Sequence, residues 1–328
     1  MSLVQPQSLS LPLILRWAAN AVAICGFLGA ASFGLAALSG IGHRWVDILA
    51  QFTAPVLMAA LIAALACLIL RLWPAAVAGG LACLVLAVAV WPQWTPPKGR
   101  PQAGAPVVRV YSANVWALNT DVAAIARSIA AADADVVILV EFGDAPAARI
   151  DQVLAGYPHR ALLGRIDRPS GPARSVIASR RPILRQLPDP PDGLSTVGAV
   201  VDTALGPITV FGVHLTRPWP FQYQWGQITQ VMALDARRRA APDHPVIAAG
   251  DFNSVSTARI GRQMKTDLGL VPAPGWPGTW PSRLPAFLGI TIDQVWRSPD
   301  LALLSRRLGE PTGSDHRPVV TEFTRAAE

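Results

Sequence analysis

The first 91 residues contain three long apolar runs without a charged side chain, at 17–39, 48–70 and 72–91. Each run has 20 residues or more. A helix of about 20 residues rises about 30 Å, the thickness of the hydrocarbon core of a bilayer. Tryptophans stand at the ends of the runs, where a membrane–water boundary favours them. The pattern predicts three transmembrane helices, at about 15–40, 48–70 and 72–91.

A cleaved signal peptide followed by buried helices is the alternative interpretation. A signal peptide has a shorter apolar core and a small-residue cleavage site, and buried helices of a soluble domain carry a polar stripe. Basic residues flank the runs on both sides, so the positive-inside rule gives no orientation. By analogy, we expect a multi-pass protein of an inner or plasma membrane, with its N-terminus inside and its C-terminal part extracytoplasmic.

Beyond residue 91 the pattern changes twice. Residues 92–106 are rich in Pro and Gly and predict an extended linker. From residue 107 on, short β-branched runs alternate with stretches of helical period, which predicts one layered α/β domain over 107–328. Helices are expected at 120–132 and 222–240. Strands are expected at 107–113, 136–142, 175–179, 198–203, 208–215, 246–252 and 319–323.

Charge and cysteine content argue against two classes of protein, dedicated nucleic-acid binders and proteins with cysteine metal sites. The chain of 328 residues has a formal net charge of +7, but residues 101–328 hold 23 basic and 20 acidic side chains. A dedicated nucleic-acid binder has a denser basic face. The cysteines Cys25, Cys67 and Cys83 all fall in the predicted spans. The α/β domain therefore has no disulfide and no cysteine metal site.

Polar side chains of a few types follow or end the apolar strands of this domain. In layered α/β folds, ligands bind beyond strand ends, because loops there present side chains from a rigid sheet. We therefore expect these residues to converge on one site. They are Asn114, Glu141, His214, Asp251, Asn253, Asp293, Asp315 and His316.

These residue types suit the hydrolysis of a phosphate ester, which requires charge neutralisation on oxygen and a positioned base. Hard cations such as Mg²⁺ take oxygen ligands. Glu141 and Asp315 are candidate metal ligands, with Asn114 as a neutral one.

The remaining residues suit proton transfer. Asp251 is the candidate base for water, and Asn253 would orient the water or the phosphate. His316 would bond a phosphoryl oxygen if Asp293 fixes its tautomer and favours its charged form.

Six short motifs occur in one order along the chain. They are NVW (114–116), the glutamate closing VVILVE (136–141), VHL (213–215), GDFN (250–253), ID (292–293) and SDH (314–316). In this set and order, residues 107–325 resemble the endonuclease/exonuclease/phosphatase superfamily. That superfamily includes pancreatic-type deoxyribonuclease, abasic-site endonucleases, inositol-phosphate phosphatases and bacterial sphingomyelinases.

The resemblance implies a four-layer α/β sandwich and dependence on Mg²⁺ or Mn²⁺. It implies that Glu141 is the principal metal ligand, with Asn114 and Asp315 close to the metal. His214 occupies the position where deoxyribonuclease-like and sphingomyelinase-like members carry histidine, and it is counted as catalytic.

The resemblance also implies the catalytic roles of the other motif residues. Asp251 and Asn253 would handle the nucleophilic water and the phosphate. His316 would be paired with Asp293. The assignment of base and acid differs among accounts of the family, so these roles stay open.

Three further residues are candidate substrate contacts. Arg174 and Arg217 would bind a phosphate group. Trp219 lies in the aromatic segment 216–225 beside His214, which either packs on the core or forms an apolar rim that contacts lipid or a base.

Membrane attachment favours a phosphate ester on a lipid, because the site would be held near a surface where such esters are concentrated. An extracytoplasmic nuclease is the main alternative. A catalytically inactive, membrane-tethered binding module and a purely structural membrane protein are the other hypotheses. Beyond the bilayer and the substrate, no protein partner follows from the sequence.

Overall fold

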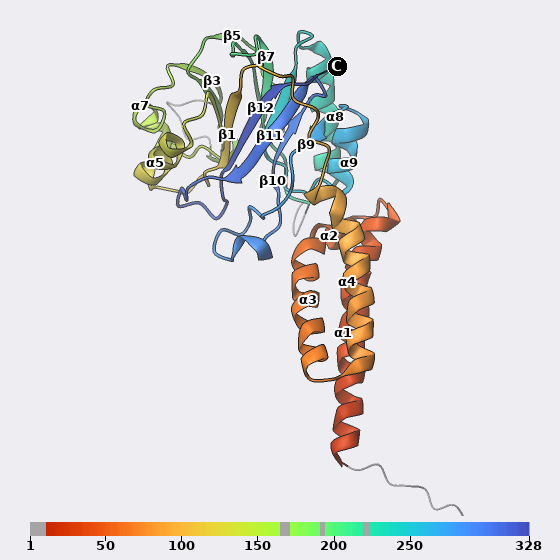
Figure 1. The fold of residues 1–328 in the computed structure, drawn as a ribbon. Coiled ribbons are helices and arrows are strands. Elements are labelled where there is room, and N and C mark those ends of the chain that lie inside the picture. Colours follow the sequence, from red (N-terminus) through yellow and green to blue (C-terminus); the bar gives the residue numbers. More distant parts are fainter. Residues whose placement is uncertain (1–10, 165–170, 191–193, 219–223, 328) are drawn as a thin grey trace, which may run out of the picture.

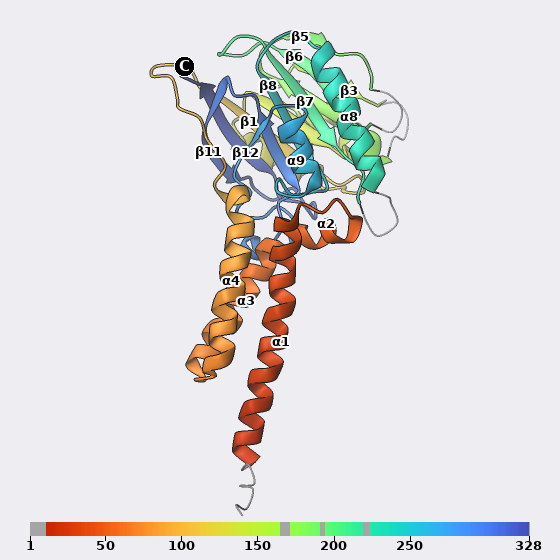
Figure 2. The same ribbon diagram turned by 90° about the vertical axis from the view of Figure 1, so that its right-hand side faces the viewer.

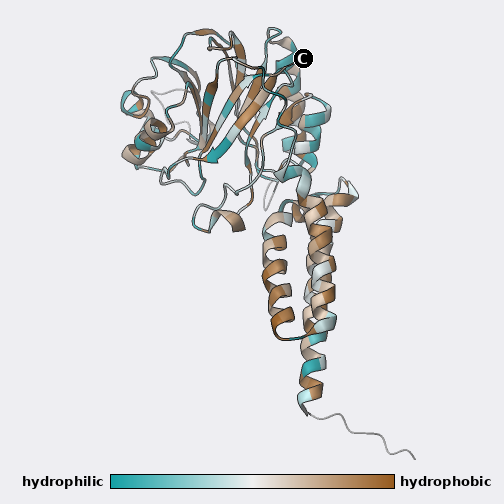
Figure 3. Cartoon of the chain, in the orientation of Figure 1, coloured by the Kyte–Doolittle hydropathy of each residue, from teal (hydrophilic) through white to brown (hydrophobic). Residues whose placement is uncertain are grey.

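The computed structural model describes residues 11–164, 171–190, 194–218 and 224–327. These residues form a bundle of helices and an α/β domain at one end of the bundle (Figure 1). Apolar residues cover most of the bundle, whereas polar and apolar residues are mixed over the domain (Figure 3).

The described part of the bundle has four helices. They are α1 (Leu11–Ser39), α2 (Arg44–Gln51), α3 (Thr53–Ile69) and α4 (Trp73–Trp94). Three of them, α1, α3 and α4, pack against one another around small and apolar side chains (Figure 2). By length and composition, α1 and α4 are suited to cross a membrane.

The predicted second span, 48–70, is not a single helix. Helices α2 and α3 meet at Phe52 with a bend of 56°. Pro55, in the first turn of α3, has no N–H to continue the helix of α2, and the polar residues Asp47 and Gln51 of α2 are buried. Asp47 accepts hydrogen bonds from two residues of the α/β domain. The domain therefore holds the start of this segment, and α2 with α3 forms at most a broken span.

The segment between α4 and the domain follows the edge of the domain. The Leu303 N–H donates to the Lys98 carbonyl at 2.7 Å, and the Ala327 N–H donates to the Arg100 carbonyl at 2.8 Å. Pro101 also forms a β-bridge with Ala326. The Pro- and Gly-rich linker is thus fixed along the domain.

The described residues of the α/β domain form two six-stranded sheets. The first has the order β11 (Leu301–Leu308), β12 (Val319–Arg325), β1 (Val108–Asn114), β2 (Val136–Val140), β4 (Ser175–Ser179), β3 (His159–Leu163). The second has the order β5 (Ile183–Gln186), β6 (Val197–Val201), β7 (Ile208–His214), β8 (Val246–Asp251), β10 (Asp293–Arg297), β9 (Val271–Pro272).

The two sheets pack face to face on a shared apolar core. Helices α5 (Val122–Ala132) and α7 (Ile150–Val153) cover the outer face of the first sheet. Helices α8 (Gln224–Ala240) and α9 (Arg259–Thr266) cover the second. The result is a helix–sheet–sheet–helix sandwich (Figure 1). The short helices in the connections are α6 (Asp144–Ala147), η1 (Gly171–Ala173) and η2 (Ala286–Leu288).

Strand direction brings the polar strand ends to one edge. Each sheet is mixed, with one parallel pair in its middle, β1–β2 and β7–β8. Parallel strands end at the same edge, so Asn114 lies beside Val140, and His214 lies beside Asp251. Strand β10 runs antiparallel to β8, and its first residue, Asp293, pairs with Asp251.

All seven predicted strands are found, with ends that differ by at most two residues. The interpretation of Asp293 was wrong in one respect. The run GITI before it lies outside the strands, and Asp293 begins β10 instead of following a strand. Strand β10 (DQVWR) was not predicted from the sequence, because the polar Gln294 and Arg297 interrupt its apolar pattern.

Candidate functional site

Side chains from both sheets meet in a cleft of about 740 Å³. Its lining includes six of the predicted residues: Glu141, His214, Asp251, Asn253, Asp315 and His316. The other two, Asn114 and Asp293, are buried and hydrogen-bonded to residues that line it. The fold therefore brings all eight polar residues predicted at strand ends into one place.

Asn114 links the ends of three strands. Its amide nitrogen donates to Glu141 Oε1 and to Asp251 Oδ2, both at 3.0 Å. Its amide oxygen accepts the backbone N–H of Trp116 at 2.9 Å. In this arrangement Asn114 holds two carboxylates near each other, and its oxygen keeps a second lone pair.

The backbone around the cleft adopts costly conformations. Trp116, Glu141 and Asn253 have φ angles of 59°, 50° and 47°, in the left-handed region that non-glycine residues rarely occupy. Such conformations cost about 1–3 kcal/mol each and gather at functional sites, where the surroundings impose them. At Glu141 the turn directs the carboxylate into the cleft, where Oε2 accepts the N–H of Ala117 at 3.2 Å.

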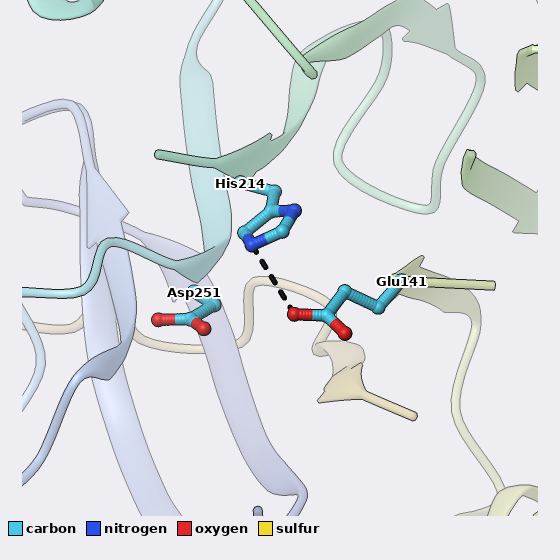
Figure 4. A group of neighbouring side chains, drawn as sticks. All are labelled: Glu141, His214 and Asp251. Atoms are coloured by element: carbon cyan, nitrogen blue, oxygen red, sulfur yellow. Dashed lines mark ion pairs between the residues drawn. The ribbon is translucent and has the colours of Figure 1, made fainter. Parts of the chain in front are cut away.

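Glu141, His214 and Asp251 form a group that fits a divalent cation (Figure 4). Each offers one donor atom, and these atoms lie within 4.8 Å of one another. The Nε2 of His214 is 3.3 Å from Glu141 Oε1. Two carboxylates suit a hard ion such as Mg²⁺, and an imidazole adds a ligand that transition-metal ions accept.

Asp315 stands apart from this group. Its side chain is 55% exposed, and its Oδ2 accepts the indole N–H of Trp280 at 3.3 Å. It lines the same cleft, so a metal contact would be made from the rim.

Asp251 is a buried carboxylate at the centre of the site. Burial raises its pKa to about 6, although the positive charge of His316 opposes the shift. Its Oδ1 accepts the backbone N–H of Asn253 at 2.8 Å. The amide of Asn253 in turn donates to the Leu215 carbonyl at 2.8 Å. A fixed carboxylate that titrates near neutral pH has the property of a general base.

His316 and Asp293 form a buried ion pair. The Nδ1 of His316 lies 2.9 Å and 3.0 Å from the two Asp293 oxygens. Burial lowers the pKa of the imidazole, but Asp293 and Asp251 outweigh this effect and raise it to about 10. The ring is therefore a cation at neutral pH, and its Nε2 lies 3.9 Å from both Asp251 and Asp315.

Comparison with known proteins places this domain in a family. Residues 111–316 match the model of the endonuclease/exonuclease/phosphatase family. The chain belongs to this family. The match agrees with the resemblance carried by the six motifs. No curated protein sequence matches the chain.

Solved structures share the fold of this endonuclease/exonuclease/phosphatase domain at low identity. An endonuclease/exonuclease/phosphatase from Beutenbergia cavernae is 22% identical, with a TM-score of 0.52 over 67% of this chain and 72% of that chain. Sphingomyelinase C from Streptomyces griseocarneus is 19% identical, with a TM-score of 0.50 over 66% and 99%. TDP2 from C. elegans is 16% identical, with a TM-score of 0.51 over 66% and 75%.

The three predicted substrate contacts have different outcomes. Arg217 lines the cleft. Arg174 is fully buried in the described structure and donates to the Phe142 carbonyl at 2.9 Å and to Asp144 at 3.0 Å. It supports the turn after β2, and the prediction that it binds substrate is wrong. Trp219 lies outside the described residues.

Trp280 and Gln51 are among the cleft residues that the sequence analysis missed. Trp280 binds Asp315 from a Pro-rich loop that has no periodic pattern. Gln51 comes from α2, inside a segment that was predicted to cross the membrane. No pattern in the sequence links either residue to the family motifs.

Proposed function

We propose that this protein is a membrane-anchored phosphodiesterase that uses Mg²⁺ or Mn²⁺ to hydrolyse phosphate esters carried by lipids. The observation that supports hydrolysis best is the position of Asp251, between the Glu141–His214 group and the protonated His316. A structural relative named sphingomyelinase C supports a lipid ester as substrate. The apolar helices α1 and α4 support membrane anchoring.

In this proposal, metal binding, proton acceptance and proton donation are carried out by different residues. Glu141 and His214 would hold the cation, with Asp315 at the rim. When bound, the cation neutralises charge on the phosphoryl oxygens. Asp251 accepts a proton from water, and Asn253 fixes the orientation of that carboxylate. His316, held as a cation by Asp293, donates from Nε2 to a phosphoryl or leaving-group oxygen.

The test is an activity screen of the full chain in detergent micelles, with and without EDTA. The substrates are bis-p-nitrophenyl phosphate, single- and double-stranded DNA, sphingomyelin and other phospholipids. EDTA should abolish hydrolysis, and Mg²⁺ or Mn²⁺ should restore it. Hydrolysis of DNA with none of lipid would favour the extracytoplasmic nuclease, and activity that persists in EDTA would refute the metal role.

Glu141→Gln is the matching variant, because it removes the charge of the proposed ligand with little change in shape. We expect turnover to fall by roughly 10²–10³-fold, the size of effect found when a charge-stabilising group is removed. Folding should persist, since the amide keeps the shape of the side chain that meets Asn114. Glu310→Gln, on an exposed side chain outside the six motifs, is the control.

A further inference from the structure

One wall of the cleft comes from outside the α/β domain. Gln51, the last residue of α2, lines the cleft together with Asp251 and His316. It is only 2% exposed. Its side-chain nitrogen has no hydrogen-bond partner within the residues that the structure describes. A buried donor without an acceptor is unfavourable, so its place beside a substrate cleft points to a ligand that completes it.

Helix α2 is held firmly against the domain. Asp47 Oδ1 accepts the backbone N–H of Arg259 at 2.6 Å, and Oδ2 accepts the side-chain amide of Gln224 at 2.6 Å. The guanidinium of Arg259 donates back to the Gly42 carbonyl at 2.9 Å. These bonds tie the α2 region to α8 and α9. The position of Gln51 is therefore set by contacts on its own helix.

The residue after Gln51 strengthens this placement. Phe52 packs against an apolar cluster that includes Ile290 and Ile292. Both isoleucines also line the cleft, and Ile292 directly precedes Asp293. Gln51 therefore enters the cleft on a backbone that is anchored beside the His316–Asp293 pair.

The opposite face of α2 is apolar and exposed. Trp45 is 58% exposed, and Leu49 is exposed four residues later, on the same side of the helix. A short helix with one face on the protein and a Trp–Leu face outward suits a membrane–water interface. In Figure 2, α2 lies between the bundle and the domain. The wall that carries Gln51 is thus the wall closest to the bundle.

We infer that α2 is part of the substrate site and that the Gln51 side-chain amide donates a hydrogen bond to a phosphoryl oxygen of the bound ester. This inference rests on the phosphodiesterase function proposed above, because that function supplies the phosphoryl group. A neutral donor suits this position. It binds an anionic oxygen in a cleft that already contains several carboxylates, and it takes no part in proton transfer.

The experiment measures binding apart from turnover, on the full chain in detergent micelles with Mg²⁺. Inorganic phosphate is titrated by calorimetry, because it offers phosphoryl oxygens and is not consumed. Gln51→Leu should weaken phosphate binding about tenfold, the effect of losing one hydrogen bond to a charged group. Gln51→Glu should weaken it further, because its carboxylate repels the anion.

Gln93→Leu is the matched control. Gln93 is also 2% exposed and lies at the domain end of α4, but it does not line the cleft in the described structure. This variant should bind phosphate as the wild type does. The melting temperature of Gln51→Leu should not fall, since the substitution removes a buried donor that has no partner in the described structure.

Turnover of bis-p-nitrophenyl phosphate and of sphingomyelin is then measured with the same variants. Gln51→Leu should raise KM about tenfold with kcat little changed, since the contact binds ground state and transition state alike. Equal phosphate binding by the wild type and Gln51→Leu would overturn the role of Gln51, even in an active enzyme. Weaker phosphate binding by Gln51→Leu in a chain that hydrolyses no ester would uphold that role and overturn the phosphodiesterase function.

Discussion

Burial and pairing give two neighbouring side chains opposite protonation states. Burial raises the pKa of Asp251 to about 6, so this carboxylate is ionised at neutral pH. Burial lowers the pKa of His316, but the surrounding carboxylates raise it to about 10, so the ring stays protonated. Activity that needs both forms should rise as Asp251 ionises, at a pH below about 6 because a bound divalent cation lowers its pKa, and should fall as His316 loses its proton at about pH 10. The pH dependence of kcat/KM at saturating Mg²⁺ measures both limbs.

The Asp293→Asn variant separates the two limbs. Asp293 is the strongest of the charges that raise the pKa of His316, so its loss lets the ring deprotonate at lower pH. The alkaline limb should move toward neutral pH, and the loss of activity should deepen as the pH rises. Asp300→Asn, on an exposed turn residue, should leave the profile unchanged. Parallel profiles for wild type and Asp293→Asn would make Asp293 a structural residue only.

His316→Ala tests whether the ring acts on the transition state or on the metal. Loss of a general acid lowers turnover by about 10²–10⁴-fold. The Mg²⁺ concentration for half-maximal activity should stay close to the wild-type value, because the nitrogen facing the cleft belongs to a cation, which does not ligate metal. A large rise in that concentration would instead make His316 a ligand.

At the scale of elements, the sequence predicts strands well where β-branched residues run together. Strand β4 (Ser175–Ser179) has the predicted bounds. Strands such as β3 (His159–Leu163) and β5 (Ile183–Gln186) were missed, because each is short and its apolar residues are followed or preceded by polar and charged ones. The bend at Phe52 was also missed, because the long apolar run drew attention away from Pro55, which has no N–H to continue the helix of α2 into α3.

The residues of the site could likewise be predicted only in part from the sequence. The polar strand ends could be found from sequence, because their types and order are distinctive. Arg174 was misassigned, since a residue type does not reveal burial, and its guanidinium is used inside the domain. Gln51 was missed, because its position depends on how α2 docks on α8 and α9. The positions of the Arg174 and Gln51 side chains both depend on contacts between segments far apart in the chain.

The docking of α2 depends on one buried carboxylate. Asp47→Leu would leave the Arg259 N–H and the Gln224 amide without their acceptor, and each unpaired buried donor costs about 1–3 kcal/mol. We expect a lower melting temperature and weaker substrate binding, because Gln51 lies on the same helix. Differential scanning fluorimetry in detergent measures the first effect. Asp151→Ala removes an exposed ion pair with Arg160 and should change the melting temperature little.

At the scale of the whole molecule, the bundle has a domain end and a far end. At the far end, Arg16 donates to the Arg71 carbonyl at 2.7 Å, which places the turn between α3 and α4 beside the N-terminal part of α1. At the domain end, the Gly42 carbonyl accepts from Arg259, and the Gln93 carbonyl accepts from the Gly275 N–H. Helices α1, α3 and α4 therefore run side by side from the domain, and the N-terminal part of α1 extends beyond the turn between α3 and α4 (Figures 1 and 2).

This arrangement leads to a prediction of topology. A bilayer that holds α1 and α4 also holds α3, which packs on both, so the chain crosses three times and the α/β domain lies opposite the N-terminus. The far end carries Arg16 and Arg71, and the domain end carries Arg44, Lys98 and Arg100 together with Asp47, so the net charge at both ends is +2. The positive-inside rule therefore gives no orientation, and we predict by analogy alone that the far end is cytoplasmic and the domain extracytoplasmic. Alkaline carbonate should leave the full chain in the membrane pellet.

A reporter that works only outside the cytoplasm should be active when fused after residue 328 and inactive when fused before residue 1. Activity of both fusions would mean an even number of crossings, with α3 re-entrant, and activity of the N-terminal fusion alone would reverse the orientation.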